Sequence, residues 1–180
     1  MTDTELDVPV DASTATDRDS WLELIEQIGA EEGSFHTLGP RHWALMVEDG
    51  RKLVVSFETM ASARARQGQM PLVHHIAAEM GWSHLCLIAE DQTWFRDPWV
   101  YAYFDRLVDE AFFDDFDRVL FYGAGPMGYA ACAFSVTAPG ARCWRWPRQP
   151  HSTRPRHAGM TVTGTPAGLI SGRATAMPPT

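Results

Sequence analysis

Apolar and amphipathic stretches alternate along the middle of the chain. Nearly continuous apolar runs at residues 84–90 and 118–123 are typical of buried strands. Residues 60–67 and 71–80 read as helical, and residues 98–112 repeat apolar side chains at a spacing near 3.6, which predicts a longer helix. Strands that alternate with helices predict an α/β fold with a mostly parallel sheet.

The residues before these runs predict how the sheet begins. Trp21, Leu22, Ile25 and Ile28 have the spacing of one face of a helix that starts near residue 19. The segment HWALMVEDGRKLVVSFE then reads as two strands joined by the Asp-Gly pair at positions 49 and 50, the strongest short hairpin signal in the chain. We therefore predict that a β-hairpin opens the sheet.

Composition and charge restrict the class of protein. The 180 residues are 45% apolar and carry a formal net charge of -8, which argues against a nucleic-acid partner because phosphate binding needs an excess of Lys and Arg. The acidic start and the lack of an apolar run near 20 residues predict a cytoplasmic protein without a membrane partner. Cys86, Cys132 and Cys143 lack the spacing of a metal site, and we expect them to be buried. No metal or cofactor is expected.

Composition also divides the chain into three segments. Residues 1–17 are expected to form a flexible tail, and residues 18–141 an incomplete α/β domain. Residues 142–180 contain six arginines and no acid, so we expect a disordered tail. A frameshift of one base near codon 142 would explain the change, because a GC-rich back-translation of Cys-Trp-Arg-Trp then reads Val-Leu-Ala-Leu, a typical buried strand. On this interpretation the tail is non-native and the domain is truncated.

A glycine-rich turn follows the strand predicted at 118–123. We take six of its residues as the main candidate ligand site: Gly123, Gly125, Pro126, Met127, Gly128 and Tyr129. The glycines match G-x-G-x-x-G between a strand and a helix, a pattern that can bind dinucleotides. However, no acidic residue follows Asp117 to hold a ribose, and Pro126 lacks an N–H. Nucleotide binding at this turn is one alternative hypothesis.

The same turn resembles part of a hydrolase. An α/β-hydrolase carries its nucleophile at the tip of a strand-turn-helix with the pattern G-x-S-x-G. The run FYGAGPMGYAA is similar to the F-Y-G-x-S-M-G-G-Y-A-A turn of some bacterial α/β-hydrolase-like proteins, and the resemblance covers about residues 20–141. It implies the N-terminal part of that fold, with Gly125 at the nucleophile position. Glycine has no hydroxyl, and Pro126 has no N–H for an oxyanion hole, so we expect no catalysis here.

A second resemblance rests on longer segments. EQIGAEEG, LGPRHWAL, SFET, WSHLCLIAEDQTWFRDP and FDRLVDEAFFDDFDRVLFYGAGPMGYAACAFSVTAPGA are similar to a group of bacterial proteins commonly labelled phosphoadenosine phosphosulfate reductase. That label implies a pyrophosphate loop with a lysine, and a cysteine motif near the end. The single lysine, Lys52, lies on a strand-like run, and Cys143 is in no such motif. We keep this label only as part of the nucleotide-binding alternative.

Other polar groups give one secondary candidate site. Asp91, Trp94, Arg96 and Asp97 follow a predicted strand, and loops at the carboxyl ends of strands face the ligand crevice of α/β sheets. Asp97 also suits the start of a helix, because its carboxylate can accept hydrogen bonds from exposed N–H groups.

Two further groups have structural interpretations. Adjacent residues on a helix point about 100° apart, so His74 and His75 are expected to be a partly buried pair rather than a metal site. Asp114, Asp115 and Asp117 are expected to form a solvated turn.

Three hypotheses of function remain open. The main one is a catalytically inactive α/β-hydrolase-like fragment, and the alternatives are a nucleotide-binding protein and a non-enzymatic interaction protein. The expected partners are an unidentified small molecule or, through an open sheet edge, a second copy of the chain.

Overall fold

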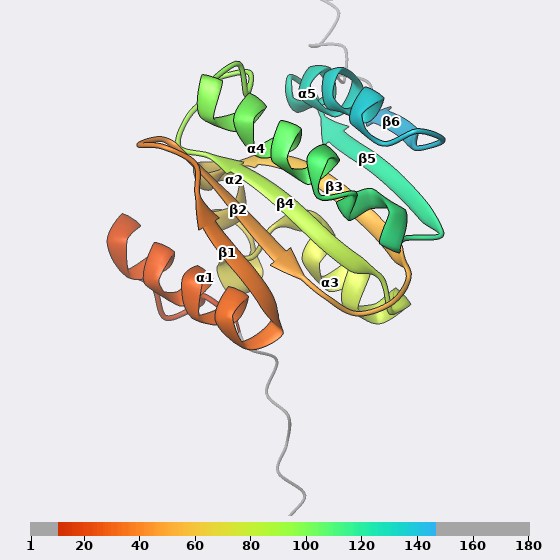
Figure 1. The fold of residues 1–180 in the computed structure, drawn as a ribbon. Coiled ribbons are helices and arrows are strands. Elements are labelled where there is room, and N and C mark those ends of the chain that lie inside the picture. Colours follow the sequence, from red (N-terminus) through yellow and green to blue (C-terminus); the bar gives the residue numbers. More distant parts are fainter. Residues whose placement is uncertain (1–10, 147–180) are drawn as a thin grey trace, which may run out of the picture. The chain divides into compact units, whose positions relative to one another are not determined.

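The computed structural model describes residues 11–146, without the side chains of residues 145 and 146. One helix and three consecutive strands open this segment, and helices and strands alternate after them (Figure 1). In chain order they are α1 (Arg18–Glu32), β1 (Gly33–Thr37), β2 (His42–Val47), β3 (Lys52–Thr59), α2 (Met60–Arg64), η1 (Gln67–Gln69), α3 (Leu72–Met80), β4 (Ser83–Ala89), α4 (Pro98–Asp109), η2 (Phe112–Asp115), β5 (Arg118–Ala124), α5 (Met127–Phe134), η3 (Ser135–Thr137) and β6 (Arg142–Trp146).

The described strands form one sheet in the order β1-β2-β4-β3-β5-β6. The pairs β3–β4, β3–β5 and β5–β6 are parallel, whereas β1–β2 and β2–β4 are antiparallel. The predicted α/β class and mostly parallel sheet are therefore confirmed.

Helices cover both faces of the sheet, with α4 and α5 on one face and α2 and α3 on the other (Figure 1). Successive side chains of a strand point to opposite faces, so each buried strand contributes to two cores. In β4, for example, Leu85 and Leu87 pack in the core under α4 and α5, whereas Cys86 and Ile88 pack in the core under α1 and α2. This double coverage explains why the strands read as continuous apolar runs.

The predicted hairpin at positions 49 and 50 is wrong. β2 and β3 do not pair with each other, because β4 lies between them and pairs with both. β4 is buried along its whole length, and a strand of that kind gains most from two neighbours. The sheet does open with a hairpin, but its strands are β1 and β2, and the sequence did not predict β1.

The predicted boundary at residue 17 is also wrong for the described residues. Ala12 and Ala15 are buried, and the N–H of Ala12 donates to the carbonyl of Gly68 at 3.0 Å. Asp17 caps α1 by accepting a hydrogen bond from the N–H of Ser20. Residues 11–17 are thus packed on the domain, and residues 1–10 lie outside the described part.

The C-terminal boundary needs a similar correction. Residues 142–146 form β6, which pairs with β5 and is not part of a disordered tail. Residues 147–180 lie outside the described part of the chain. Cys132 and Cys143, expected to be buried, are both exposed, and their Sγ atoms lie 2.8 Å apart.

The remaining predicted helices are confirmed with small changes in their ends. α4 begins where expected, because Asp97 accepts a hydrogen bond from the N–H of Trp99 at 3.0 Å and Pro98 occupies the first turn. Within residues 11–146, no helix combines the length and the apolar character that a membrane crossing requires.

Candidate functional site

The strand order creates a crevice at the carboxyl ends of β3 and β5. From β3 the chain passes through α2 and α3 to β4 on one side, whereas β5, on the other side of β3, leads into α5 over the opposite face. The two connections diverge at this point, and ligands of α/β sheets bind where connections diverge in this way. A cavity of about 170 Å³ lies here, lined by Phe57, Glu58, Thr59, Ser62, Arg66, Gln92, Tyr122, Ala124, Pro126 and Met127.

The glycine turn borders this crevice through Pro126 and Met127, two of its six candidate residues, whereas Gly123, Gly125, Gly128 and Tyr129 do not line it. Gly125 lies at the tip between β5 and α5 with a φ of 56°, in the left-handed region that favours glycine. A Cβ added at Gly125 would meet no atom within 4 Å, whereas one added at Gly123 would lie 2.4 Å from the carbonyl oxygen of Met127. Gly123 is therefore required for close packing of α5, and Gly125 for the backbone conformation of the tip.

Most N–H groups of the turn are unsuited to bind an anion. Pro126 has none, and the N–H groups of Gly128 and Tyr129 donate to the carbonyls of Gly125 and Pro126, each at 3.2 Å. A phosphate bound at a helix N-terminus needs several N–H groups that point outward together. The geometry of this turn therefore gives little support to a phosphate cradle.

Glu58 and Arg66 form an ion pair in the opposite wall. Glu58 is the second-to-last residue of β3 and is 6% exposed, and its Oε2 accepts from Nη1 of Arg66 at 2.5 Å. Its other oxygen accepts from the N–H of Leu72 at 2.9 Å, so the carboxylate also fixes the start of α3. Nη2 of Arg66 donates to Oγ of Ser62 at 3.0 Å. Both sides of the carboxylate are thus occupied by donors from this chain.

The environment of Glu58 changes its acidity. Burial raises the pKa of the Glu58 carboxyl above its ordinary value, because burial penalises the charged form. The positive charge of Arg66 and the N–H of Leu72 oppose this effect only in part. A buried carboxyl with a raised pKa in a cleft is a feature typical of functional sites, and structural ion pairs show it as well.

The secondary candidate loop meets the glycine turn at one point. The guanidinium of Arg96 lies 4.7 Å from the ring centre of Tyr129, and its Nη2 donates to the Tyr129 hydroxyl at 2.5 Å. The Trp94 ring packs edge-on against the same tyrosine at 6.1 Å. Asp91 instead pairs with Arg41 at 2.8 Å on the surface, and Asp97 caps α4. The structure therefore joins Trp94 and Arg96 to the main candidate site and leaves the two aspartates outside it.

Backbone strain marks the same loop. Trp94 and Phe95 both have positive φ, 58° and 55°, which is rare for bulky side chains. The Phe95 side chain is fully buried against Phe57, with ring centres 5.1 Å apart, and the Phe95 N–H donates to Oγ1 of Thr93. Strain of this kind persists only where surrounding packing enforces it. The loop is thus held in one conformation beside the crevice.

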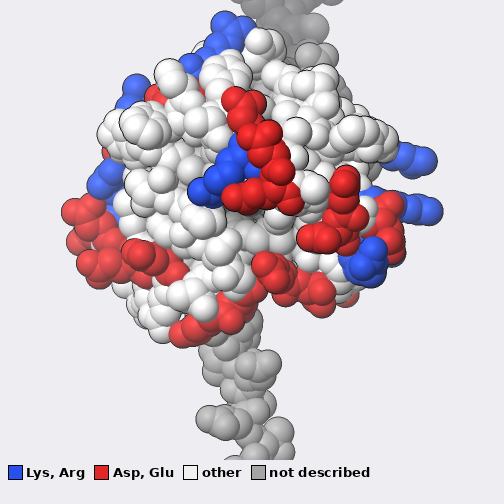
Figure 2. All heavy atoms as spheres, viewed as in Figure 1, with Lys and Arg blue, Asp and Glu red and all other residues white. Residues whose placement is uncertain are grey.

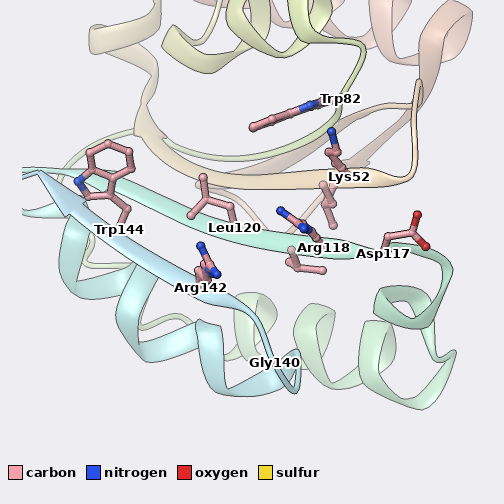
Figure 3. A pocket seen from close by; sticks show the side chains of 10 residues that line it. Lys52, Trp82, Asp117, Arg118, Leu120, Gly140, Arg142 and Trp144 are labelled. Carbon is pink, nitrogen blue, oxygen red and sulfur yellow. The ribbon is translucent and has the colours of Figure 1, made fainter.

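A larger hollow of about 520 Å³ lies at the opposite edge of the sheet, where β3, β5 and β6 begin (Figure 3). Lys52 points toward the ring of Trp82, with its Nζ 5.5 Å from the ring centre, and Arg118 and Arg142 reach into the same space from neighbouring strands. Asp117, the one acid among the described residues of its wall, is paired with Arg51. The hollow therefore has positive charge available for an anion.

Sequence reasoning missed the polar wall of the crevice. Glu58, Ser62, Arg66 and Gln92 were not predicted, although Glu58 lies near the carboxyl end of β3, which is where site residues occur in α/β sheets. The signal was missed because β3 was predicted to pair with β2 in a hairpin, whereas it is a central strand that pairs in parallel with β4 and β5.

Comparison of the chain with protein-family models, with curated proteins and with solved structures finds no match in any of the three.

Proposed function

We propose that this chain is a catalytically inactive α/β-hydrolase-like protein that binds a small molecule in the crevice between β3 and β5 without covalent chemistry. The observation that carries the proposal is the conformation of Gly125. It has a positive φ and a half-buried position at the tip between a strand and a helix, which is where a hydrolase holds its nucleophile. The turn is retained while its reactive group is missing.

The chemistry of the turn supports the loss of catalysis. Acyl transfer needs a nucleophile at the tip and an N–H at the next residue to stabilise the oxyanion. Gly125 supplies no hydroxyl and Pro126 supplies no N–H. Glu58 is a buried carboxylate that lines the crevice, and its engagement by Arg66 and Leu72 makes it a poor general base.

The crevice retains features of a binding site. Its volume of about 170 Å³ suits a small ligand, and its lining combines the apolar side chain of Phe57 with the polar side chains of Ser62 and Gln92. A few placed hydrogen-bonding groups on an apolar wall are the usual composition of such pockets. We therefore expect a small, polar and largely uncharged ligand, because Glu58 and Arg66 already neutralise each other.

The proposal predicts no turnover of activated esters. Purified protein mixed with p-nitrophenyl acetate or with an acyl thioester should release product at the rate of buffer alone, because both reactive parts of the turn are absent. A crevice-blocked variant, Ala124→Trp, should behave identically in this assay. Ala124 is exposed and lines the crevice, so a large side chain there can fill it without disturbing the core.

Binding supplies the complementary readout. Fragments detected by ligand-observed NMR should bind the native protein and Ala133→Trp, whose substitution lies on an exposed position of α5 outside the crevice, but not Ala124→Trp. Ester or thioester turnover that disappears in Ala124→Trp and persists in Ala133→Trp would disprove the inactive assignment.

A second candidate function is nucleotide binding, and the hollow at the amino ends of the strands favours it over the glycine turn. Lys52, Arg118 and Arg142 can neutralise phosphates, and Trp82 and Trp144 offer rings for a base to stack on. Calorimetry with ATP and with NAD should then show heat of binding that Arg118→Gln weakens about tenfold. Heat that is absent, or equal in Arg118→Gln and in a distant control, Arg106→Gln, would exclude this site.

A further inference from the structure

His42 begins β2 beside the loop of residues 90–97, which connects β4 to α4. In the antiparallel pairing of β2 with β4, His42 lies opposite Ala89, the last residue before this loop. The His42 side chain is 1% exposed, and its carbonyl accepts a hydrogen bond from the N–H of Leu38 at 2.7 Å. The backbone that carries the ring is therefore fixed, and the ring itself is buried.

A hydrogen bond joins the His42 ring to this loop. Nε2 of His42 lies 2.6 Å from Oγ1 of Thr93, and the same oxygen accepts from the N–H of Phe95 at 3.3 Å. The rings of His42 and Phe95 are 5.6 Å apart. Thr93 therefore connects a buried histidine to the backbone of Phe95, one of the two loop residues with positive φ.

The loop is held in an unfavourable backbone conformation. Trp94 and Phe95 both occupy the left-handed region, and bulky residues stay there only while surrounding contacts outweigh the strain. The Trp94 side chain is 41% exposed and packs edge-on against Tyr129. The loop thus depends on the buried Phe95 ring and on the hydrogen bonds of Thr93, and weakening either contact favours a relaxed conformation.

The surroundings of His42 suit a neutral ring. Within residues 11–146, no carboxylate forms an ion pair with it. Asp97 favours a positive charge on the ring from a distance, whereas Arg41 opposes one. The other acids of the loop are engaged in ion pairs, Glu90 with Arg18 and Asp91 with Arg41. Nδ1 of His42 has no hydrogen-bond partner in the described chain, so a protonated ring would bury an N–H without an acceptor.

Burial also couples the loop to pH. It lowers the pKa of His42 below its ordinary value of 6.5, because the charged ring would lose its hydration. A lowered pKa in the closed loop means that protonation favours a conformation in which the ring reaches water. The stability of the closed loop is therefore fully present above pH 6.5 and is lost as the pH falls through the lowered pKa of His42.

We propose that His42 is a pH-sensitive switch for the loop of residues 90–97, whose neutral ring holds the loop closed through Thr93 and whose protonation releases it. On release, the ring turns toward water and its hydrogen bond to Thr93 breaks. The left-handed backbone of the loop then relaxes, and Trp94 moves away from Tyr129.

Release of the loop would also change the crevice. Gln92 lines the crevice and directly precedes Thr93, so its side chain moves with the loop. The switch itself is a property of the loop and is independent of any ligand. Its effect on binding rests on the function proposed for the crevice.

NMR of ¹⁹F in protein labelled with 5-fluorotryptophan tests the switch. The chain has seven tryptophans, and loss of a resonance in Trp94→Phe assigns the one that reports on the loop. We expect this resonance to move as the pH is lowered from 7.5, with a midpoint below 6.5 and before circular dichroism detects global unfolding. In His42→Gln, whose amide cannot be protonated in this range, the resonance should keep its position.

Two further variants separate the switch from general effects of acid. Thr93→Val has a similar shape but lacks Oγ1, so its Trp94 resonance at pH 7.5 should already have the position that the native protein reaches in acid. His75→Gln removes an exposed histidine of α3 and should titrate like the native protein.

Three results would overturn the proposal. The first is a native Trp94 resonance that stays in place until global unfolding, and the second is a shift of equal size and midpoint in His42→Gln. The third is a Thr93→Val resonance that keeps the native position at pH 7.5, which decides the question even if His42→Gln does not fold.

Discussion

Replacing Arg66 with alanine is expected to lower the free energy of unfolding by about 3 kcal/mol at pH 7. The substitution leaves the carboxylate of Glu58, which is 6% exposed, without its cationic partner. One hydrogen bond, from the N–H of Leu72, then remains to compensate for burial of the charge. Because that hydrogen bond begins α3, loss of the ion pair should also loosen the wall of the crevice.

The pH dependence of this effect has a definite sign. Burial raises the pKa of Glu58 in the folded protein above its ordinary value of 4.5, and removal of Arg66 raises that pKa further. A raised folded-state pKa gives stability that is fully present below pH 4.5 and is lost as the pH rises through the folded value. The deficit of Arg66→Ala relative to the native protein should therefore be largest at pH 7 and shrink toward pH 4.5.

Urea denaturation at several pH values measures both quantities. Arg41→Ala is the control, because Arg41 pairs with Asp91 at a similar distance but on the surface, where such a pair contributes at most about 1 kcal/mol. An Arg66→Ala deficit no larger than that of Arg41→Ala, or one that grows as the pH falls, would contradict the structural role given to the pair.

Gly123→Ala is expected to destabilise the fold by about 3 kcal/mol, because the new Cβ meets backbone atoms that cannot rotate away. It would lie 2.4 Å from the carbonyl oxygen of Met127 and 2.7 Å from the nitrogen of Gly128. The start of α5 would have to move off the sheet, which would also distort the crevice. Gly125→Ala should cost about 1 kcal/mol, since its Cβ enters open space and only the positive φ is strained.

Thermal and chemical denaturation of this pair of variants tests the geometry of the turn. Both variants replace glycine with alanine, at positions two residues apart. A difference between their free energies of unfolding therefore comes from the position of the added methyl group. If Gly125→Ala proved the more destabilising of the two, the close packing of α5 on β5 described here would be incorrect.

Sequence patterns predicted the elements better than their pairing. The spacing of apolar residues predicts buried strands and helices with one apolar face, as in β4 and α4. Pairing depends on contacts between distant residues, and the Asp-Gly pair at positions 49 and 50 is a local signal that the fold overrides by inserting β4. β1 was missed because its five residues are only partly buried and carry little apolar character.

In the candidate site, too, residues marked by a local pattern were predicted and residues that meet only in the folded chain were missed. The glycine turn was predicted from a local motif, and Trp94 and Arg96 from their position after a strand. Glu58 and Arg66 come together from different elements, β3 and the segment after α2, so only the folded chain reveals their pairing. Residues of a site that come from one segment can therefore be predicted from the sequence, whereas residues brought together from several elements cannot.

The strand β6 illustrates a further limit of local patterns. Its sequence, Arg-Cys-Trp-Arg-Trp, has the composition of the segment that follows it, yet it pairs in register with β5. The crevice contains no described residue beyond Met127, so the ligand site proposed there does not depend on β6.

The contact between Cys132 and Cys143 makes the edge of the sheet sensitive to the oxidant or reductant in the buffer. Their sulfur atoms lie 2.8 Å apart on α5 and β6, both in exposed positions. Hydrogen peroxide can take two electrons and two protons from such a pair of thiols, forming a disulfide and water. β6 would then be tied covalently to α5 and could not peel away from β5 alone. In a reductant the same strand is held by hydrogen bonds and packing, so its departure would uncover a backbone edge to which another chain could add a strand.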